Sequence, residues 1–69
     1  MTLYLVERDF GKNGTEVIGY REYTRSKVID LIAKGEWPNL IRVLEVIEDE
    51  GSVRDVTEDM QMEAAHELV

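Results

Sequence analysis

The stretch that decides the fold is TRSKVIDLIAKG, residues 24–35. Its apolar side chains recur at the spacing of one helix face: Val28, Ile29, Leu31, Ile32 and Ala33. Thr24 and Ser26 carry hydroxyl groups suited to capping the first turn, and Gly35 is typical of the position just after a helix ends. The pattern therefore predicts a helix over this stretch, and Pro38 then turns the chain away from it.

The residues before this helix predict a β-hairpin. Residues 2–10 (TLYLVERDF) are rich in aromatic and apolar side chains, which favour a strand. Residues 11–14 (GKNG) include an Asn-Gly pair, which adopts positive φ at little cost in a turn. Residues 15–20 (TEVIGY) then return as a second, short strand, although Gly19 weakens it.

Residues 40–48 are open to two interpretations. Arg42, Glu45 and Asp49 have the i, i+3, i+7 spacing of a polar stripe on an amphipathic helix. In contrast, this part of the chain is crowded with β-branched residues: Ile41, Val43, Val46, Ile47 and Val53. Because residues 48–51 (EDEG) also have the composition of a hairpin turn, we favour a strand, a turn and a short strand over 52–56.

A second helix is predicted at the C-terminal end of the chain. Asp55 or Thr57 caps it, and Glu58 stands three residues after Asp55, as in a capping box. Its apolar residues share one broad arc of the helix: Met60, Ala64, Ala65 and Leu68, extended by Met62 and Val69. Its polar residues share the opposite arc: Asp59, Glu63, His66 and Glu67.

These elements predict an α+β fold in one domain, residues 1–69. We expect a small antiparallel sheet of three to four short strands packed against two helices, in two layers. The expected core residues are Leu5, Val28, Leu31, Ile32, Leu44, Val46, Met60 and Leu68. A chain of this length buries only about 60% of its unfolded surface, and it has no cysteine for a disulfide.

The charge is unevenly distributed. The net charge is −7; residues 1–44 hold six acids and seven bases, whereas residues 45–69 hold nine acids and one base. Nucleic acids and anionic membranes bind basic surfaces, so neither is an expected partner. An acidic surface of this kind instead complements a basic groove on another protein.

Seven carboxylates are the candidate partner-binding residues. They are Glu48, Asp49, Glu50, Asp55, Asp59, Glu63 and Glu67. The last three are four residues apart on the predicted C-terminal helix, where like charges at this spacing oppose helix formation. One interpretation is a solvated face without a task; the other is an anionic stripe that imitates the phosphates of DNA in a basic groove.

No residue pattern supports catalysis, a metal site or a cofactor. Glu63 and His66 have the Glu-x-x-His spacing of di-iron bundles, but such sites draw ligands from four helices. If Gly51 were the loop glycine of an EF-hand, Val46 and Thr57 would occupy positions that require carboxylates. We therefore expect a protein that is not an enzyme and binds neither metal nor cofactor.

Residues 10–18 (FGKNGTEVI) resemble the Ile-Gly-x-x-Gly-x-x-Ile core of KH nucleic-acid-binding domains, in which Gly-x-x-Gly clamps the nucleotide backbone. That loop joins two helices, whereas here it follows a predicted strand. Gly19 would also break the second helix at once, and the net charge is acidic. A hairpin turn therefore explains these residues better than a KH loop.

Three segments, residues 42–47 (RVLEVI), 50–51 (EG) and 54–59 (RDVTED), resemble small proteins encoded by bacteriophages, some of which are anti-CRISPR proteins. The resemblance implies an acidic protein of the bacterial host cytoplasm that inhibits a host DNA-binding or CRISPR-type defence complex. The alternative is a self-associating structural or adaptor module, a homodimer. It rests on the small core and on the apolar arc of the C-terminal helix.

Overall fold

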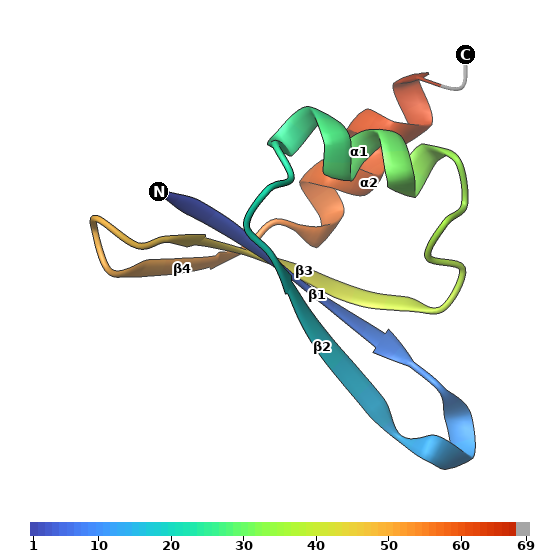
Figure 1. Ribbon diagram of the computed structural model, residues 1–69. Coiled ribbons are helices and arrows are strands. Elements are labelled where there is room, and N and C mark those ends of the chain that lie inside the picture. The colour runs from blue at the N-terminus through green and yellow to red at the C-terminus, as the bar shows by residue number, and fades with distance from the viewer. Residues whose placement is uncertain (68–69) are drawn as a thin grey trace.

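A four-stranded antiparallel sheet with two helices on one of its faces forms the fold, in a computed structural model that describes residues 1–67 (Figure 1). The elements in chain order are β1 (Thr2–Asp9), β2 (Thr15–Tyr20), α1 (Arg25–Ala33), β3 (Leu40–Ile47), β4 (Ser52–Asp55) and α2 (Thr57–Glu67). The strand order across the sheet is β2-β1-β3-β4. The predicted α+β fold class, with a small antiparallel sheet packed against two helices in two layers, is confirmed.

The turn between β1 and β2 is a short 3-10 segment, Gly11–Asn13. Gly11 and Gly14 both have positive φ, at 64° and 83°, a conformation that glycine adopts without a Cβ clash. The backbone N–H of Gly11 also donates to Oδ1 of Asp9 at 2.8 Å. The Gly-x-x-Gly motif therefore lies in a hairpin turn between two strands.

Local hydrogen bonds set both ends of α1. Oγ1 of Thr24 accepts from the backbone N–H of Lys27 at 3.1 Å, as predicted for the N-cap. At the other end, Gly35 has φ of 74°, and its N–H donates to the carbonyl of Ile32 while the next N–H donates to that of Leu31. This pair of bonds is a Schellman motif, which satisfies carbonyls that the helix leaves free.

Residues 40–47 form the strand β3, so the predicted strand is confirmed and the helical alternative is wrong. β3 pairs with β1 on one side and β4 on the other, with Val43 opposite Val6 and Val46 opposite Val53. These β-branched side chains pack well across a pleated sheet, and the two ladders satisfy most of the backbone of β3. β4 ends at Asp55, and Val56 is a buried residue between β4 and α2.

The order of the strands gives the fold an internal two-fold arrangement. Each half of the chain forms a hairpin followed by a helix, and the first strands of the two hairpins, β1 and β3, pair antiparallel in the middle of the sheet. The two helices pack side by side on the same face (Figure 1). The sequence shows no repeat, so this symmetry exists at the level of topology.

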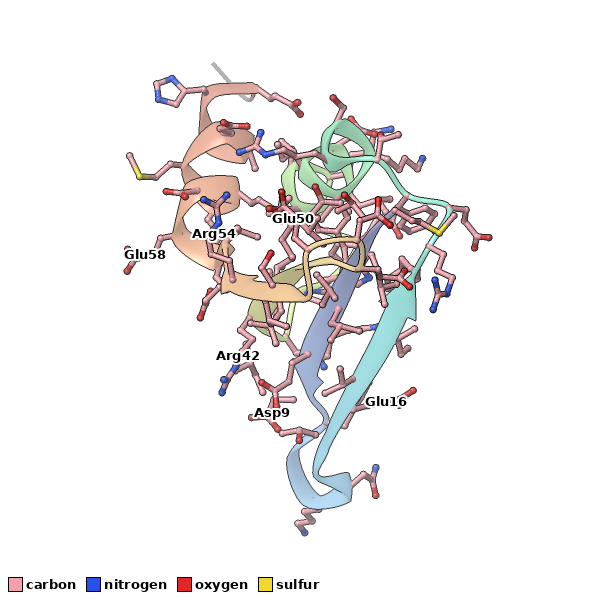
Figure 2. The ribbon with its side chains drawn as sticks, turned by 90° about the vertical axis from the view of Figure 1, so that its left-hand side faces the viewer. Asp9, Glu16, Arg42, Glu50, Arg54 and Glu58 are labelled. Atoms are coloured by element: carbon pink, nitrogen blue, oxygen red, sulfur yellow. The ribbon has the colours of Figure 1, made fainter. Side chains whose placement is uncertain are left out.

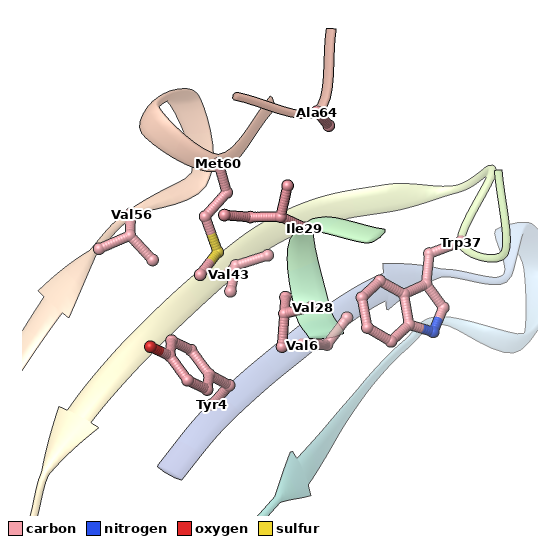
Figure 3. Close-up of a cluster of buried hydrophobic side chains, with 9 residues drawn as sticks. All are labelled: Tyr4, Val6, Val28, Ile29, Trp37, Val43, Val56, Met60 and Ala64. Carbon is pink, nitrogen blue, oxygen red and sulfur yellow. The ribbon is translucent and has the colours of Figure 1, made fainter. Parts of the chain in front are cut away.

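The core lies between the sheet and the two helices (Figure 3). Its buried residues are Tyr4, Val6, Val28, Ile29, Trp37, Val43, Val56, Met60 and Ala64. Val28 and Met60 were predicted core residues, and both are fully buried. Leu31 and Ile32 are partly buried against the cluster, and Leu68 lies outside the described residues.

The prediction that Leu5, Leu44 and Val46 belong to this core is wrong. Side chains alternate between the two faces of a strand, and β1 places Tyr4 and Val6 under the helices. Leu5 therefore points to the opposite face, together with its cross-strand partner Leu44. All three residues are partly exposed there.

We call this opposite face the open sheet face. Alternation and strand register assign twelve residues to it: Leu3, Leu5, Glu7, Asp9, Thr15, Val17, Gly19, Arg42, Leu44, Val46, Val53 and Asp55. Gly19 has a packing role, because a Cβ on it would lie 3.3 Å from Cδ atoms of both Leu3 and Leu5. The two leucine side chains therefore lie over the glycine, which accounts for this residue near the end of β2.

Candidate functional site

The junction between β4 and α2 is organised by the side chain of Thr57. Its Oγ1 accepts from the backbone N–H of Val43 at 2.8 Å and donates to Oδ1 of Asp55 at 2.6 Å. The carbonyl of Val56 accepts from Met60, so it is engaged in the first turn of α2. The hydroxyl of Thr57 thus takes the place of the strand carbonyl that Val43 would otherwise pair with.

Asp55 holds the start of α2, but not through the predicted capping box. Its Oδ1 accepts from the backbone N–H of Thr57 at 3.0 Å, and no bond to Glu58 is formed in the described part of the chain. The hydrogen bond from the Thr57 hydroxyl, reinforced by the one from its N–H, lowers the pKa of Asp55 below its ordinary value. Asp55 therefore stays ionised to a lower pH than an ordinary aspartate does.

Three carboxylates gather around the first turn of α2, and we call them the α2 acidic surface: Asp55, Glu58 and Asp59. All three are exposed, and they border an open hollow that is also lined by Ile41, Arg42, Thr57 and Gln61. Figure 2 shows Glu58 on the outer side of α2, pointing away from the sheet. The positive end of the helix dipole lies at the same place, which favours negative charge there.

Glu63 does not belong to a free anionic stripe. Its two carboxylate oxygens accept from Arg25 of α1 at 2.5 and 3.0 Å, in a bidentate ion pair between the two helices. The hydrogen bond from Arg25 lowers the pKa of Glu63, and the pKa of Arg25 is raised in turn. The predicted stripe of Asp59, Glu63 and Glu67 is therefore interrupted in the middle by a neutralised group.

The acidic turn between β3 and β4 is also partly neutralised. Glu48 pairs with Arg21 at 2.5 Å, and Asp49 pairs with the terminal ammonium of Met1 at 2.7 Å. Glu50 is exposed at the same turn and makes no ion pair with any residue in 1–67 (Figure 2). This turn lies at the other end of β4 from Asp55, about 14 Å away by the rise of an extended strand.

The structure therefore divides the nine carboxylates of residues 45–69 into two groups. Four of them are ion-paired: Glu45, Glu48, Asp49 and Glu63. Five have no cationic partner among residues 1–67: Glu50, Asp55, Glu58, Asp59 and Glu67. Three of the four pairs use cationic groups from the N-terminal half, so folding brings the two unequal halves of the charge distribution together.

Of the seven predicted partner-binding residues, four have no cationic partner in the described part of the chain: Glu50, Asp55, Asp59 and Glu67. The prediction missed Glu58, which lies on the same surface as Asp59. Its position next to Asp59 at the start of a helix was a usable signal, but the capping-box interpretation assigned it a structural role. In the structure Glu58 forms no capping box with Asp55 and instead borders the hollow beside Asp59.

Within residues 1–67, no cluster of three or more histidine, cysteine, aspartate or glutamate side chains is arranged to hold a metal ion. His66 is exposed near the end of α2. No helix in the described part of the chain has the length and apolar character needed to cross a membrane. What the α2 acidic surface offers chemically is a fixed set of hydrogen-bond acceptors with negative charge, suited to lysine and arginine.

Comparison of the chain with protein-family models, with curated proteins and with solved structures finds no match.

Proposed function

We propose that this chain binds a protein that carries a groove lined by lysine and arginine, and that the α2 acidic surface makes the contact. The observation that carries the proposal is the grouping of Asp55, Glu58 and Asp59 around the start of α2. None of the three forms an ion pair within residues 1–67, and the basic residue at the edge of the hollow is Arg42. Arg42 forms an ion pair with Glu7 at 2.7 Å, so its positive charge is balanced by that carboxylate.

The rigidity of this surface supports a binding role. Asp55 is fixed by two hydrogen bonds to Thr57, and α2 is anchored by the burial of Met60 and Ala64. A charged surface that is already ordered loses little conformational entropy on binding, and complementary charge accelerates encounter with a basic partner. Glu50 and Glu67 extend the negative potential on either side.

A basic groove of this kind is typical of proteins that bind nucleic acid, where it neutralises phosphates. A chain that occupies the groove excludes the nucleic acid and so acts as a competitive inhibitor. The resemblance to phage-encoded proteins favours a host DNA-binding protein or a CRISPR-type defence complex as the target. The proposal therefore includes inhibition in a bacterial cytoplasm as its most specific form.

The experiment compares two double variants that remove the same charge from different places. Glu58→Gln with Asp59→Asn neutralises the α2 acidic surface, and Glu16→Gln with Glu22→Gln neutralises two exposed carboxylates of the N-terminal half that form no ion pair within residues 1–67. Each tagged protein is used to capture partners from a bacterial lysate, with elution in salt steps. Captured proteins are then tested for DNA binding with and without the chain.

We expect the parent and the Glu16 and Glu22 variant to capture the same DNA-binding protein and to displace its DNA. The α2 variant should lose at least tenfold in affinity, since two charge-assisted contacts are removed. Equal capture by both variants would assign binding to another surface. Captured proteins that keep their DNA in the presence of the chain would refute competitive inhibition.

A further inference from the structure

The open sheet face carries six apolar side chains that no helix covers within residues 1–67: Leu3, Leu5, Val17, Leu44, Val46 and Val53. Val17 and Val53 are 54% and 62% exposed, near the two edges of the sheet. We propose that a second copy of the chain docks on this face, so that two sheets pack face to face in a symmetric dimer. The apolar residues form a band across all four strands.

The distribution of charge points to a second copy as the occupant. The chain carries a net charge of −7, so two copies repel each other over most of their surfaces. On the open sheet face the charges are Glu7 and Arg42, which pair at 2.7 Å, with Asp9 at the end of β1 and Asp55 at the end of β4. The centre of this face is therefore neutral, and two copies repel each other less there than over the rest of their surfaces.

The same ion pair is self-complementary. In a symmetric dimer the same surface is used on both copies, so residue i of one copy contacts residue j of the other and the reverse. Charged groups in such an interface are therefore matched only if the surface carries both signs. Glu7 and Arg42 supply one of each, directly opposite each other on β1 and β3. A basic partner, in contrast, finds no unpaired carboxylate in the middle of this face.

The area agrees with a small dimer interface. Four strands about 4.8 Å apart, with lengths of eight, six, eight and four residues, cover roughly 19 by 21 Å, or about 400 Å² in projection. Protruding side chains increase the accessible area, so two copies together bury roughly 1,000 Å². This is the lower end for a specific interface, and it predicts a dimer that dissociates in the micromolar range or above.

The apolar arc of α2, predicted from the sequence as the surface for self-association, is partly occupied within residues 1–67. Met60 and Ala64 are 0% and 3% exposed because they pack in the core between α2, α1 and the sheet. Met62 is 63% exposed, and besides the small side chain of Ala65 its neighbours on α2 include the charged residues Glu58 and Asp59. Among the described residues, the open sheet face is therefore the larger exposed apolar surface.

The experiment uses residues matched in exposure on the two surfaces. Val53→Lys and Val17→Lys place a charge on opposite sides of the open sheet face, and Met62→Lys places the same charge on α2. Analytical ultracentrifugation over a concentration series measures the dissociation constant of each protein. Far-UV circular dichroism verifies that each variant keeps the fold, and the two valine positions give two independent tests.

We expect the parent to reach twice its monomer mass of 8.0 kDa as its concentration rises. Each valine variant should raise the dissociation constant at least tenfold, because a dimer would bury two unpaired ammonium groups. Met62→Lys should change it less than about threefold, since an exposed charge costs little. Moderate salt should strengthen the dimer of the parent, because it screens the repulsion between acidic copies.

A parent that stays monomeric up to about 1 mM would overturn the proposal. So would dissociation by Met62→Lys but not by the valine variants, which would assign the interface to α2. The result can be separated from the proposed function, because the two helices lie on the other face of the sheet (Figure 1) and the variants that test the proposed function change Glu58 and Asp59 of α2. The two surfaces meet at Asp55 and Arg42, which none of these variants changes. Loss of the dimer through Val53→Lys should leave capture of a basic partner intact.

Discussion

Replacing Thr57 with valine removes a single oxygen atom from the junction between β4 and α2 and keeps the shape of the side chain. That oxygen is the acceptor for the backbone N–H of Val43, at 2.8 Å. Val43 is fully buried in the middle of the core, so water does not replace the lost acceptor. The variant therefore leaves a buried donor without a partner.

The expected loss of stability is about 2 kcal/mol. A buried donor left unsatisfied costs about 1–3 kcal/mol, and the hydrogen bond from the Thr57 hydroxyl to Asp55 is lost as well. The added methyl group recovers only a fraction of a kcal/mol because Thr57 is only partly buried. For a domain of this size, a loss of about 2 kcal/mol corresponds to a decrease in Tm of roughly 10 °C.

Urea denaturation of the parent, Thr57→Val and Thr57→Ser measures this effect. Serine keeps the hydroxyl and loses one methyl group, so it should cost less than about 1 kcal/mol. The slope of unfolding against urea should be the same for all three proteins if only the stability of the native state changes. Hydrogen exchange at the Val43 amide provides a local test, because this amide should exchange faster in the valine variant alone.

The reasoning would be refuted by a valine variant within about 0.5 kcal/mol of the parent, or by one no less stable than the serine variant. Unchanged exchange at Val43 would have the same meaning. Either result would show that the N–H of Val43 has another acceptor in solution.

Three further predictions concern other parts of the fold. Glu63→Gln should destabilise the protein at pH 7, because the pKa of Glu63 is lowered in the folded state. This stabilisation is present above the ordinary pKa of 4.5 and is lost as the pH falls through the lower folded value. Urea denaturation curves of parent and variant should therefore converge in acid. Gly35→Ala should cost about 1 kcal/mol because φ is 74° there, whereas Gly19→Ala, at ordinary φ and against flexible leucine tips, should cost less in the same thermal unfolding assay. Met60→Ala should cost about 2–4 kcal/mol by leaving a core cavity, and Met62→Ala less than about 0.5 kcal/mol; equal losses would contradict the burial of α2.

Elements with local signals were predictable from the sequence, and α1 is the clearest case. Thr24 and Gly35 mark its ends through bonds that involve only neighbouring residues. β3 was predictable from its β-branched residues, although a helical pattern competed with them. The inward face of the sheet was not predictable, because Leu3, Tyr4, Leu5 and Val6 are all apolar. The sequence of β1 therefore shows no alternation of apolar and polar residues that would identify the buried face.

The acidic region that contains the candidate site was predictable, but the ion pairs that neutralise some of its carboxylates were not. The excess of acids after residue 44 is visible in the sequence. Which of them remain unpaired depends on contacts between distant residues, such as Arg21 with Glu48 and Arg25 with Glu63, which are 27 and 38 positions apart. Only the antiparallel pairing of β1 with β3 and the packing of α1 on α2 bring these groups together.

The β2-β1-β3-β4 order also has a consequence for how the chain folds. Each hairpin closes a short loop, which takes microseconds, but the central β1–β3 ladder joins residues up to 45 positions apart, such as Thr2 and Ile47. The entropy of closing that loop is lost before the central contacts form, so pairing of the two hairpin–helix halves is the slow event. Substitutions at the Val6–Val43 pair and in either hairpin turn should therefore slow refolding more than they accelerate unfolding, because these contacts form before or during the slow event.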